Sequence, residues 1–170
     1  MKKLKGIYLA AYRAFHPNYD IVYQDINGLR DVGGNMLDVC LDDYDYIIAS
    51  PPCNWWSKAN YRRDESPYSL RTKWLLPAIL YKLLQIGKPF IVENVRNDSR
   101  FHQYHLFDLP LYVYTIGRHT YWTNCFLSLD CLQVEDNVIY TPQADRQGGE
   151  NVHNVIETWL EDLHFDINEV

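Results

Sequence analysis

Two short apolar runs on either side of one amphipathic segment restrict the fold of this chain more than any other feature. Residues 46–49 (YIIA) and 90–92 (FIV) are typical of buried strands, and residues 70–86 between them carry apolar side chains at helical spacing. Gly87 and Pro89 are expected to end this helix, because glycine suits a C-cap and proline cannot continue the helical hydrogen bonds. A strand, a helix and a second strand in this order predict two neighbouring parallel strands of an α/β fold.

The remaining apolar segments extend this pattern. We predict further strands at residues 6–10, 20–24 and 36–40, and Pro77 either begins the main part of the central helix or kinks it. A helix is predicted near the C-terminus, where apolar residues follow helical spacing over about three turns. These residues are Val152, Val155, Ile156, Trp159, Leu160 and Leu163. Because no internal repeat or linker interrupts the chain, residues 1–170 are expected to form a single domain.

Composition restricts the setting in which the chain works. The net charge of −6 argues against broad non-specific binding to nucleic acid. Four basic residues near the main motif either contact phosphate locally or form a solvated loop, namely Arg62, Arg63, Arg71 and Lys73. No apolar run approaches the length of a membrane span and no signal segment follows the basic N-terminus, so a cytoplasmic protein without membrane contact is expected. The four cysteines lack the spacing of a zinc site, and no metal site is expected.

Reactive side chains follow three of the predicted strands, at the point where each strand ends. They are Asp25, Cys53 directly after residues 50–52 (SPP), and Glu93. In open α/β sheets, ligands bind at the carboxyl ends of the strands. A thiol on a proline-stiffened turn is held rigidly, and its thiolate is a nucleophile. The crossover helix would bring neighbouring strand ends together, so we expect Cys53 and Glu93 to face one ligand; taken singly, each also suits an ordinary structural or surface role.

Residues 49–53 (ASPPC), followed downstream by residues 93–95 (ENV), resemble the paired catalytic signatures of DNA cytosine-5 methyltransferases. The match is closest to the short forms found in phages and prophages, and it spans roughly residues 6–95. The resemblance implies a Rossmann-like methyltransferase fold, in which a mostly parallel sheet is flanked by helices. It also implies a DNA-modifying transferase that uses S-adenosylmethionine, located in the cytoplasm of a bacterial host or phage-infected cell.

The resemblance implies a role for each residue of the two motifs. Cys53 would attack C6 of a flipped-out cytosine, and Glu93 would hydrogen-bond the ring N3 and the exocyclic amine as the adduct forms. C5 would then take the methyl group, and elimination would release Cys53. Arg118 stands where the family supplies an active-site arginine. The substrate-binding residues implied by the resemblance are Pro52, Asn54, Ser57, Asn94 and Val95.

On the donor side, the resemblance implies that Asp25 binds the ribose and that Asp38 contacts adenine. Pro51 and Asn151 are also assigned to the donor pocket by this resemblance. Asn151 belongs to residues 146–152 (RQGGENV), which are similar to the family's final motif before its terminal helix.

The sequence departs from the family at three places. Residues 10–17 (AAYRAFHP) contain no glycine where the family has a Gly-rich donor loop, which restricts how closely the backbone approaches a ligand. Residues 54–57 (NWWS) are bulkier than those that usually follow the catalytic cysteine. Residues 123–145 are too few for a separate target-recognition domain, so none is expected.

Three functions are therefore open. The first is a minimal cytosine-5 methyltransferase that acts on DNA. The second keeps Cys53 and Glu93 but uses no methyl donor, and performs other pyrimidine chemistry on DNA or a nucleotide, such as base excision. The third is a catalytically inactive fold that binds nucleic acid, a nucleotide or a protein. The chain is also short enough for a second subunit to complete a sheet edge or the cofactor cleft in a homo-oligomer.

Overall fold

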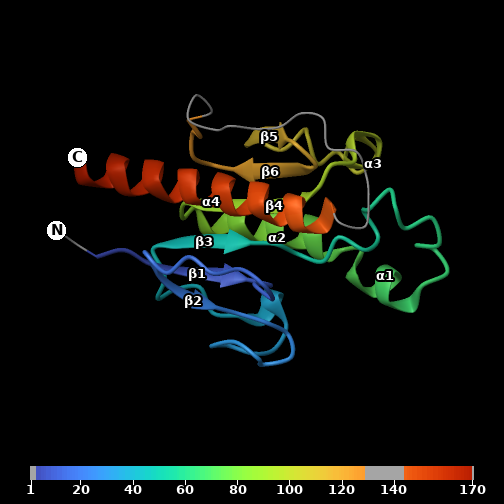
Figure 1. The fold of residues 1–170 in the computed structure, drawn as a ribbon, viewed down its shortest axis with the longest axis horizontal. Helices are drawn as coiled ribbons and strands as arrows, with labels where there is room; N and C mark the ends of the chain where they lie inside the picture. Colours follow the sequence, from blue (N-terminus) through green and yellow to red (C-terminus); the bar gives the residue numbers. More distant parts are fainter. Residues whose placement is uncertain (1–2, 129–143, 170) are drawn as a thin grey trace.

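The computed structural model describes residues 3–128 and 144–169. In this part of the chain, six strands form one sheet with the order β2-β1-β3-β4-β6-β5 (Figure 1). Strands β2, β1, β3 and β4 pair in parallel, whereas β6 is antiparallel to both β4 and β5. The strands are β1 (Lys5–Leu9), β2 (Asp20–Tyr23), β3 (Tyr46–Ala49), β4 (Phe90–Val95), β5 (Tyr112–Ile116) and β6 (His119–Thr123).

Helices cover both faces of this sheet. In Figure 1, α4 crosses one face of the sheet, and α2 lies on the opposite face. The fold is therefore a mixed α/β sheet flanked by helices, in agreement with the predicted class. The helical segments are η1 (Met36–Asp38, a 3-10 helix), α1 (Pro67–Thr72), α2 (Leu75–Ile86), α3 (Asp98–Gln103) and α4 (Ala144–Glu169).

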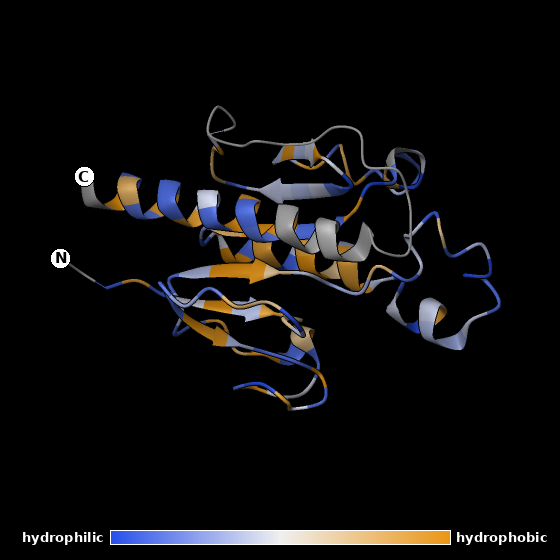
Figure 2. Cartoon of the chain, in the orientation of Figure 1, coloured by the Kyte–Doolittle hydropathy of each residue, from blue (hydrophilic) through white to orange (hydrophobic). Residues whose placement is uncertain are grey.

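The central strands are apolar throughout because both of their faces are covered. Ile47 packs in the core on the α2 side, and its neighbour Ile48 packs in the core on the α4 side. Figure 2 shows hydrophobic residues concentrated in β3 and α2, and hydrophilic residues on the outer side of α4. Each fully buried isoleucine or leucine stabilises the fold by roughly 1.5–3 kcal/mol. The predicted apolar stripe of the C-terminal helix is confirmed, since Trp159 and Leu160 are both buried in this core.

Gly6 allows β1 to lie directly beside β3. The two strands pair Gly6 with Tyr46, and a Cβ built on Gly6 would lie 2.1 Å from the Tyr46 ring. Any larger side chain would displace this ring, which is fully buried. The glycine therefore places the ends of β1 and β3 next to each other.

The predicted strand at residues 36–40 was wrong, because Met36–Asp38 forms the 3-10 helix η1. The side chain of Asn35 accepts a hydrogen bond from the Leu37 N–H at 2.9 Å, and its backbone carbonyl accepts one from the Asp38 N–H at 3.0 Å. An asparagine that bonds the following backbone in this way favours a helical turn over strand pairing.

The predicted helix over residues 70–86 is two helices, since α1 ends at Thr72 and α2 begins at Leu75. Pro77 lies in the first turn of α2, where a backbone N–H has no partner inside the helix, so Pro77 belongs to the start of α2. The predicted C-cap is confirmed, because Gly87 has a left-handed φ of 72° and donates its N–H to the Leu83 carbonyl.

Strands β5 and β6 and helix α3 have no counterpart among the sequence predictions. Among the described residues, no helix is both long and apolar enough to cross a bilayer.

Candidate active site

Strands β3 and β4 end side by side at one edge of the sheet. Ala49, the last residue of β3, pairs with Val92 of β4, and the two strands run in parallel. The chain then continues from β3 towards Cys53, while β4 continues through Glu93. Both predicted motifs therefore lie at the same edge of the sheet, which is where open α/β sheets bind ligands.

The loop that carries Cys53 is held by its backbone, whereas the Cys53 side chain is exposed. The buried Pro51 accepts a hydrogen bond on its carbonyl from the Asn94 side-chain amide at 3.0 Å, which joins the two motifs directly. The Cys53 carbonyl accepts a hydrogen bond from the Ser57 N–H at 2.8 Å and closes a turn. The loop therefore presents an accessible thiol from a constrained backbone.

Two tryptophans anchor this loop below the thiol. Trp56 is fully buried, and its indole N–H donates to the Lys73 carbonyl at 3.1 Å. The Asn97 side chain donates to the Trp56 carbonyl at 2.6 Å, and the buried Arg100 guanidinium donates to the Trp55 carbonyl. The bulk that distinguishes this loop from the family thus packs into the core beside α3 and leaves the thiol exposed.

Glu93 lies in a polar cluster, which we call the carboxylate cluster, formed by Tyr8, Ser50, Glu93, His119 and Tyr121. The Glu93 side chain is 13% exposed, and its Oε1 lies 3.6 Å from His119 Nε2. Glu93 pairs with Tyr121 across the sheet, and the Tyr8 and Ser50 hydroxyls share a hydrogen bond of 2.8 Å. Burial, followed by the negative charge of Glu93, raises the pKa of both tyrosines well above the ordinary value. Both phenols therefore stay protonated at neutral pH.

Two atoms of the carboxylate cluster are buried without a hydrogen-bond partner among the described residues. They are the Tyr121 hydroxyl and His119 Nδ1. A buried polar atom left without a partner costs about 1–3 kcal/mol, and such atoms are often found where a ligand binds. The cluster therefore holds a carboxylate and unused hydrogen-bonding atoms close to the end of β4.

The predicted substrate residues near β4 have defined positions. Asn94 is buried, and besides holding Pro51 it accepts a hydrogen bond on Oδ1 from the Val95 N–H at 2.9 Å. Arg118 occupies the turn between β5 and β6, and its carbonyl accepts a hydrogen bond from the Arg96 N–H at 2.8 Å. This turn places Arg118 at the carboxyl end of β4. The contacts of Asn94, Val95 and Arg118 with a substrate remain predictions.

The predicted substrate residues on the Cys53 loop differ in exposure. Asn54 is exposed, and Pro52 and Ser57 are half-buried. The Asn54 carbonyl accepts a hydrogen bond from the Asn60 side chain at 2.8 Å, and the Ser57 hydroxyl accepts one from the Ala59 N–H at 3.3 Å. Their substrate contacts also remain predictions.

The loop after β1 turns sharply without a glycine. Ala10 adopts a left-handed φ of 55°. Its N–H donates to the Gln24 side chain and the Ala11 N–H donates to the Gln24 carbonyl, both at 2.8 Å. Residues 10–19 contain no helix. The first strand end therefore lacks the helix N-terminus that often binds an anionic group in α/β proteins, and its backbone donors bond within the protein.

Of the four residues predicted to bind the methyl donor, Pro51 lies in the Cys53 loop, and the other three lie after β2 and in two helical segments. Asp25 is 4% exposed, and its carboxylate accepts hydrogen bonds from the N–H groups of Asn27 at 3.2 Å and Leu29 at 3.4 Å. Asp38 is exposed in η1. Asn151 lies within α4, and its side chain is outside the described part of the structure. Their contacts with a donor remain predictions.

The order of the strands reverses at β1, because β2 lies on one side of β1 and β3 on the other. A ligand of an open α/β sheet commonly binds at such a switch point. The two loops that follow β1 and β2 expose four large apolar side chains, namely Tyr12, Phe15, Ile26 and Leu29, and the Leu29 N–H donates to the Asp25 carboxylate. Apolar surface beside a carboxylate fits a ligand that combines a flat ring with hydroxyl groups.

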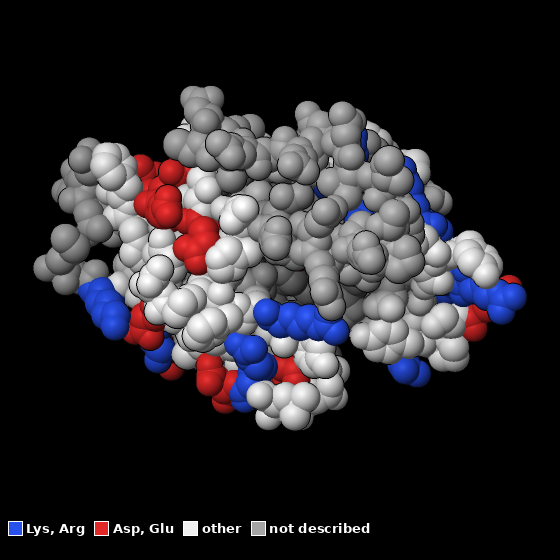
Figure 3. All heavy atoms as spheres, in the orientation of Figure 1, with Lys and Arg blue, Asp and Glu red and all other residues white. Residues whose placement is uncertain are grey.

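Charge is unevenly distributed over the molecule. In the view of Figure 3, acidic side chains gather over the C-terminal part of α4, and basic side chains are frequent towards the α1 end. Residues 54–73, which follow Cys53 in the sequence, contain five basic and two acidic side chains. This segment offers the positive charge that the overall composition lacks.

The chain resembles part of a curated protein. Over 87 residues, the chain is 31% identical to the Type II methyltransferase M1.HgaI of Avibacterium volantium. The match covers 49% of this chain but only 24% of that protein, so the chain spans about a quarter of its relative's length. No family model matches the chain.

Sequence reasoning missed part of this candidate site. His119 and Tyr121 alternate along β6 and both approach Glu93, but no strand was predicted there. Alternation within residues 119–123 would have placed the two side chains on one face of a strand. The anchoring roles of Asn97 and Arg100 had no local signal, because both act on carbonyl groups more than 40 positions earlier in the chain.

Proposed function

We propose that this chain transfers a methyl group to C5 of cytosine in DNA, with Cys53 as the nucleophile and Glu93 as the group that binds the pyrimidine. One observation carries the proposal. An exposed thiol follows β3 on a constrained loop, this loop is bonded through Asn94 to the adjacent parallel strand β4, and β4 carries a largely buried carboxylate. A nucleophile and a ring-binding acid at neighbouring strand ends are what addition to a pyrimidine requires.

The proposed chemistry begins with the Cys53 thiolate adding to C6 of a cytosine that has been rotated out of the duplex. Glu93 hydrogen-bonds N3 and the exocyclic amine, which stabilises the charge that develops on the ring. The adduct makes C5 nucleophilic, and C5 takes the methyl group. Loss of the C5 proton and re-formation of the C5–C6 double bond then expel the Cys53 thiolate. The neutral phenols of Tyr8 and Tyr121 add no negative charge around Glu93 during these steps.

S-adenosylmethionine supplies the methyl group when it is bound. The residues that would hold it lie at the ends of β1 and β2, where the strand order reverses. Asp25 would accept hydrogen bonds from the ribose hydroxyls, and Asp38 would contact the adenine. The exposed side chains of Ile26 and Leu29 offer apolar surface to the adenine ring. Pro51 would border the same pocket from the Cys53 loop.

A second candidate function is pyrimidine chemistry without a methyl donor. It is favoured by the loop after β1, where Ala10 replaces a glycine, no helix follows, and the backbone donors bond to Gln24. In this candidate, Cys53 still adds to C6 and Glu93 still binds the ring. The products would be a modified or excised base in DNA or a modified nucleotide.

Covalent trapping separates the two candidates. The purified protein is incubated with a pool of duplex oligonucleotides that contain 5-fluorocytosine in randomised sequence, with and without S-adenosylmethionine. Methyl transfer predicts a covalent protein–DNA complex that needs the donor, because fluorine at C5 prevents the elimination that releases Cys53. The Cys53→Ser variant should form none, and Glu93→Gln should form much less.

The other outcomes each exclude a candidate. A complex that forms equally without the donor favours the second candidate, and the products released from unmodified DNA and free nucleotides then identify its reaction. No complex under either condition contradicts both candidates and favours a fold that only binds its partner. Calorimetric titration with S-adenosylmethionine tests donor binding separately, and no detectable binding excludes the first candidate.

A further inference from the structure

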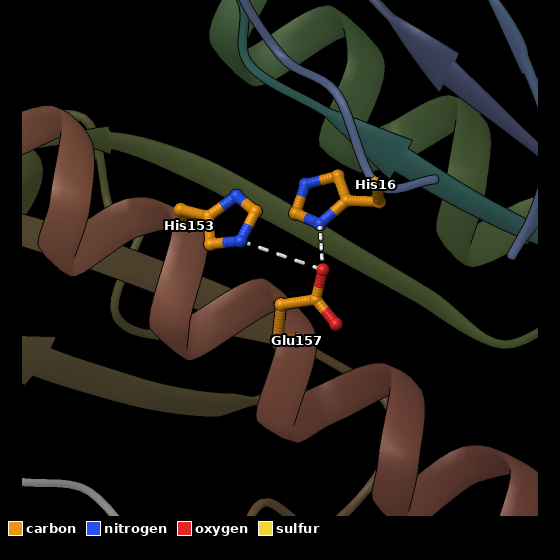
Figure 4. Close-up of side chains that lie close together, drawn as sticks. All are labelled: His16, His153 and Glu157. Carbon is orange, nitrogen blue, oxygen red and sulfur yellow. Dashed lines mark hydrogen bonds and ion pairs between the residues drawn. The ribbon is translucent and has the colours of Figure 1, made fainter. Parts of the chain in front are cut away.

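Three metal-ligating side chains converge outside the carboxylate cluster and the Cys53 loop. His16 lies in the loop between β1 and β2, and His153 and Glu157 lie one helical turn apart on α4 (Figure 4). Glu157 Oε1 is 2.8 Å from His16 Nδ1 and 3.5 Å from His153 Nε2. All three ligand atoms lie within 4.8 Å of one another. Spacing along the sequence does not predict this group, because His16 and Glu157 are 141 positions apart.

The surroundings of His16 hold its ring in place. Its backbone N–H donates to the Tyr23 hydroxyl at 2.7 Å. Its ring lies between those of Tyr8 and His153, and its centroid is 4.6 Å from that of His153 with an angle of 6° between the two planes. The two imidazoles are therefore stacked with a nitrogen of each turned towards one carboxylate oxygen, as Figure 4 shows.

We propose that His16, His153 and Glu157 form a site for a divalent transition-metal ion of the zinc type. Two imidazole nitrogens and one carboxylate oxygen are a common ligand set for such ions. A tetrahedral zinc ion holds its ligand atoms about 3.3 Å apart, since its bonds are about 2.0–2.2 Å long. The observed separations of 2.8 and 3.5 Å to the Glu157 oxygen lie on either side of this value.

The three side chains of the proposed metal site differ in how exposed they are. His16 is 2% exposed, whereas the side chains of Glu157 and His153 are 21% and 47% exposed. The inner ligand is thus fixed by the core, and the outer ligand borders solvent. An ion would reach the site from the His153 side, and water would complete its coordination there.

The bound ion would fasten the loop after β1 to α4. Without it, these two elements meet here through a single carboxylate and two rings. The proposal does not rest on methyl transfer, because none of the three ligands takes part in that chemistry.

Zinc alone is the probe for this site. Tag-free full-length protein, first dialysed against a chelator, is titrated with Zn²⁺ by calorimetry, and with Co²⁺ while the visible absorption of a tetrahedral ion is followed. We expect saturable binding of one equivalent. His153→Ala and Glu157→Gln should weaken the affinity about tenfold or more, because each loses a direct ligand. Both positions are at least partly exposed, so circular dichroism should show an unchanged fold.

The control is His105→Ala. His105 is 78% exposed and lies 2.8 Å from Asp108, and among the described residues this histidine–carboxylate pair belongs to no group of three potential metal ligands. This variant should bind zinc as the unaltered protein does. Absence of saturable binding to the unaltered protein overturns the proposal, and so does affinity that survives both ligand substitutions. Neither result bears on covalent trapping by Cys53, so failure of this proposal is distinguishable from failure of the proposed function.

Discussion

Ala10 has a left-handed backbone conformation, which is unfavourable for residues other than glycine. Its φ of 55° places the Cβ in a crowded position, at a cost of about 1–2 kcal/mol. The cost is offset by two hydrogen bonds to Gln24, one from Ala10 itself and one from Ala11. The two hydrogen bonds therefore hold a sharp turn at a residue that is not glycine.

We expect Ala10→Gly to leave the free energy of unfolding unchanged or to raise it by up to about 1 kcal/mol. Glycine relieves the left-handed strain, while its greater freedom in the unfolded chain costs about 0.5–1 kcal/mol. Ala11→Gly is the matched control, because Ala11 is buried and, unlike Ala10, does not have a positive φ. It should lower the free energy by about 1–2 kcal/mol through lost burial and added freedom. Urea denaturation measures both, and an equal loss in the two variants would contradict the strain at Ala10.

At the scale of elements, the segment between β3 and α2 is held mainly by side-chain hydrogen bonds to its backbone and by its two buried tryptophans. Its backbone carbonyls receive side-chain donors from β4 and α3, and both indoles are buried beneath it. This arrangement explains how a long irregular loop keeps Cys53 in one place. Trp55 and Trp56 are buried in the core, whereas the Cys53 side chain is exposed.

Trp56→Ala should lower the free energy of unfolding by about 3–5 kcal/mol, because it removes a fully buried indole and leaves a cavity. It also removes the donor to the Lys73 carbonyl. Trp74→Ala is the control, since Trp74 is 55% exposed, and it should cost less than about 1 kcal/mol. Urea denaturation of both variants tests the difference. Similar small losses would show that the Cys53 loop is not anchored by Trp56.

At the scale of the whole molecule, the sheet is covered on both faces, and the phenols of Tyr8, Tyr46 and Tyr121 are buried with it. Burial is the largest cause that raises the pKa of Tyr8, Tyr46 and Tyr121 above the ordinary value of 10. The native protein therefore keeps protons that the unfolded chain releases in alkaline solution. Their stabilising effect is fully present below pH 10 and is lost as the pH rises above it.

The free energy of unfolding should fall steeply above about pH 10, by about 1.4 kcal/mol per pH unit for each of these tyrosines. Tyr121→Phe should reduce this slope by one such contribution. It should not destabilise the protein at pH 7, because the Tyr121 hydroxyl has no hydrogen-bond partner among the described residues. Tyr61→Phe, at an 82% exposed position, is the control for removing a hydroxyl from the surface. Urea midpoints between pH 8 and pH 11 measure the slopes, and equal slopes in all three proteins would contradict the prediction.

The local pattern of residues was sufficient for the parallel half of the sheet. The strand at residues 46–49 and the helix end at Gly87 were predicted correctly, and the apolar run at 90–92 lies within β4. These features depend on contacts between near neighbours and on the covering of both sheet faces, which produces unbroken apolar runs. The motifs at residues 49–53 and 93–95 were visible for the same reason, since each is a short continuous segment.

Contacts between distant segments were decided only by the tertiary structure. Strands β5 and β6 mix polar and aromatic residues, so their pairing depends on the register with β4 rather than on local hydropathy. The approach of His119 to Glu93 and of His16 to Glu157 likewise depends on elements that meet after folding. A sequence pattern describes residues that are neighbours along the chain. A site made of several side chains depends instead on distances between segments that lie far apart in the sequence. The two motifs were therefore recognisable from the sequence, and the side chains that surround them were not.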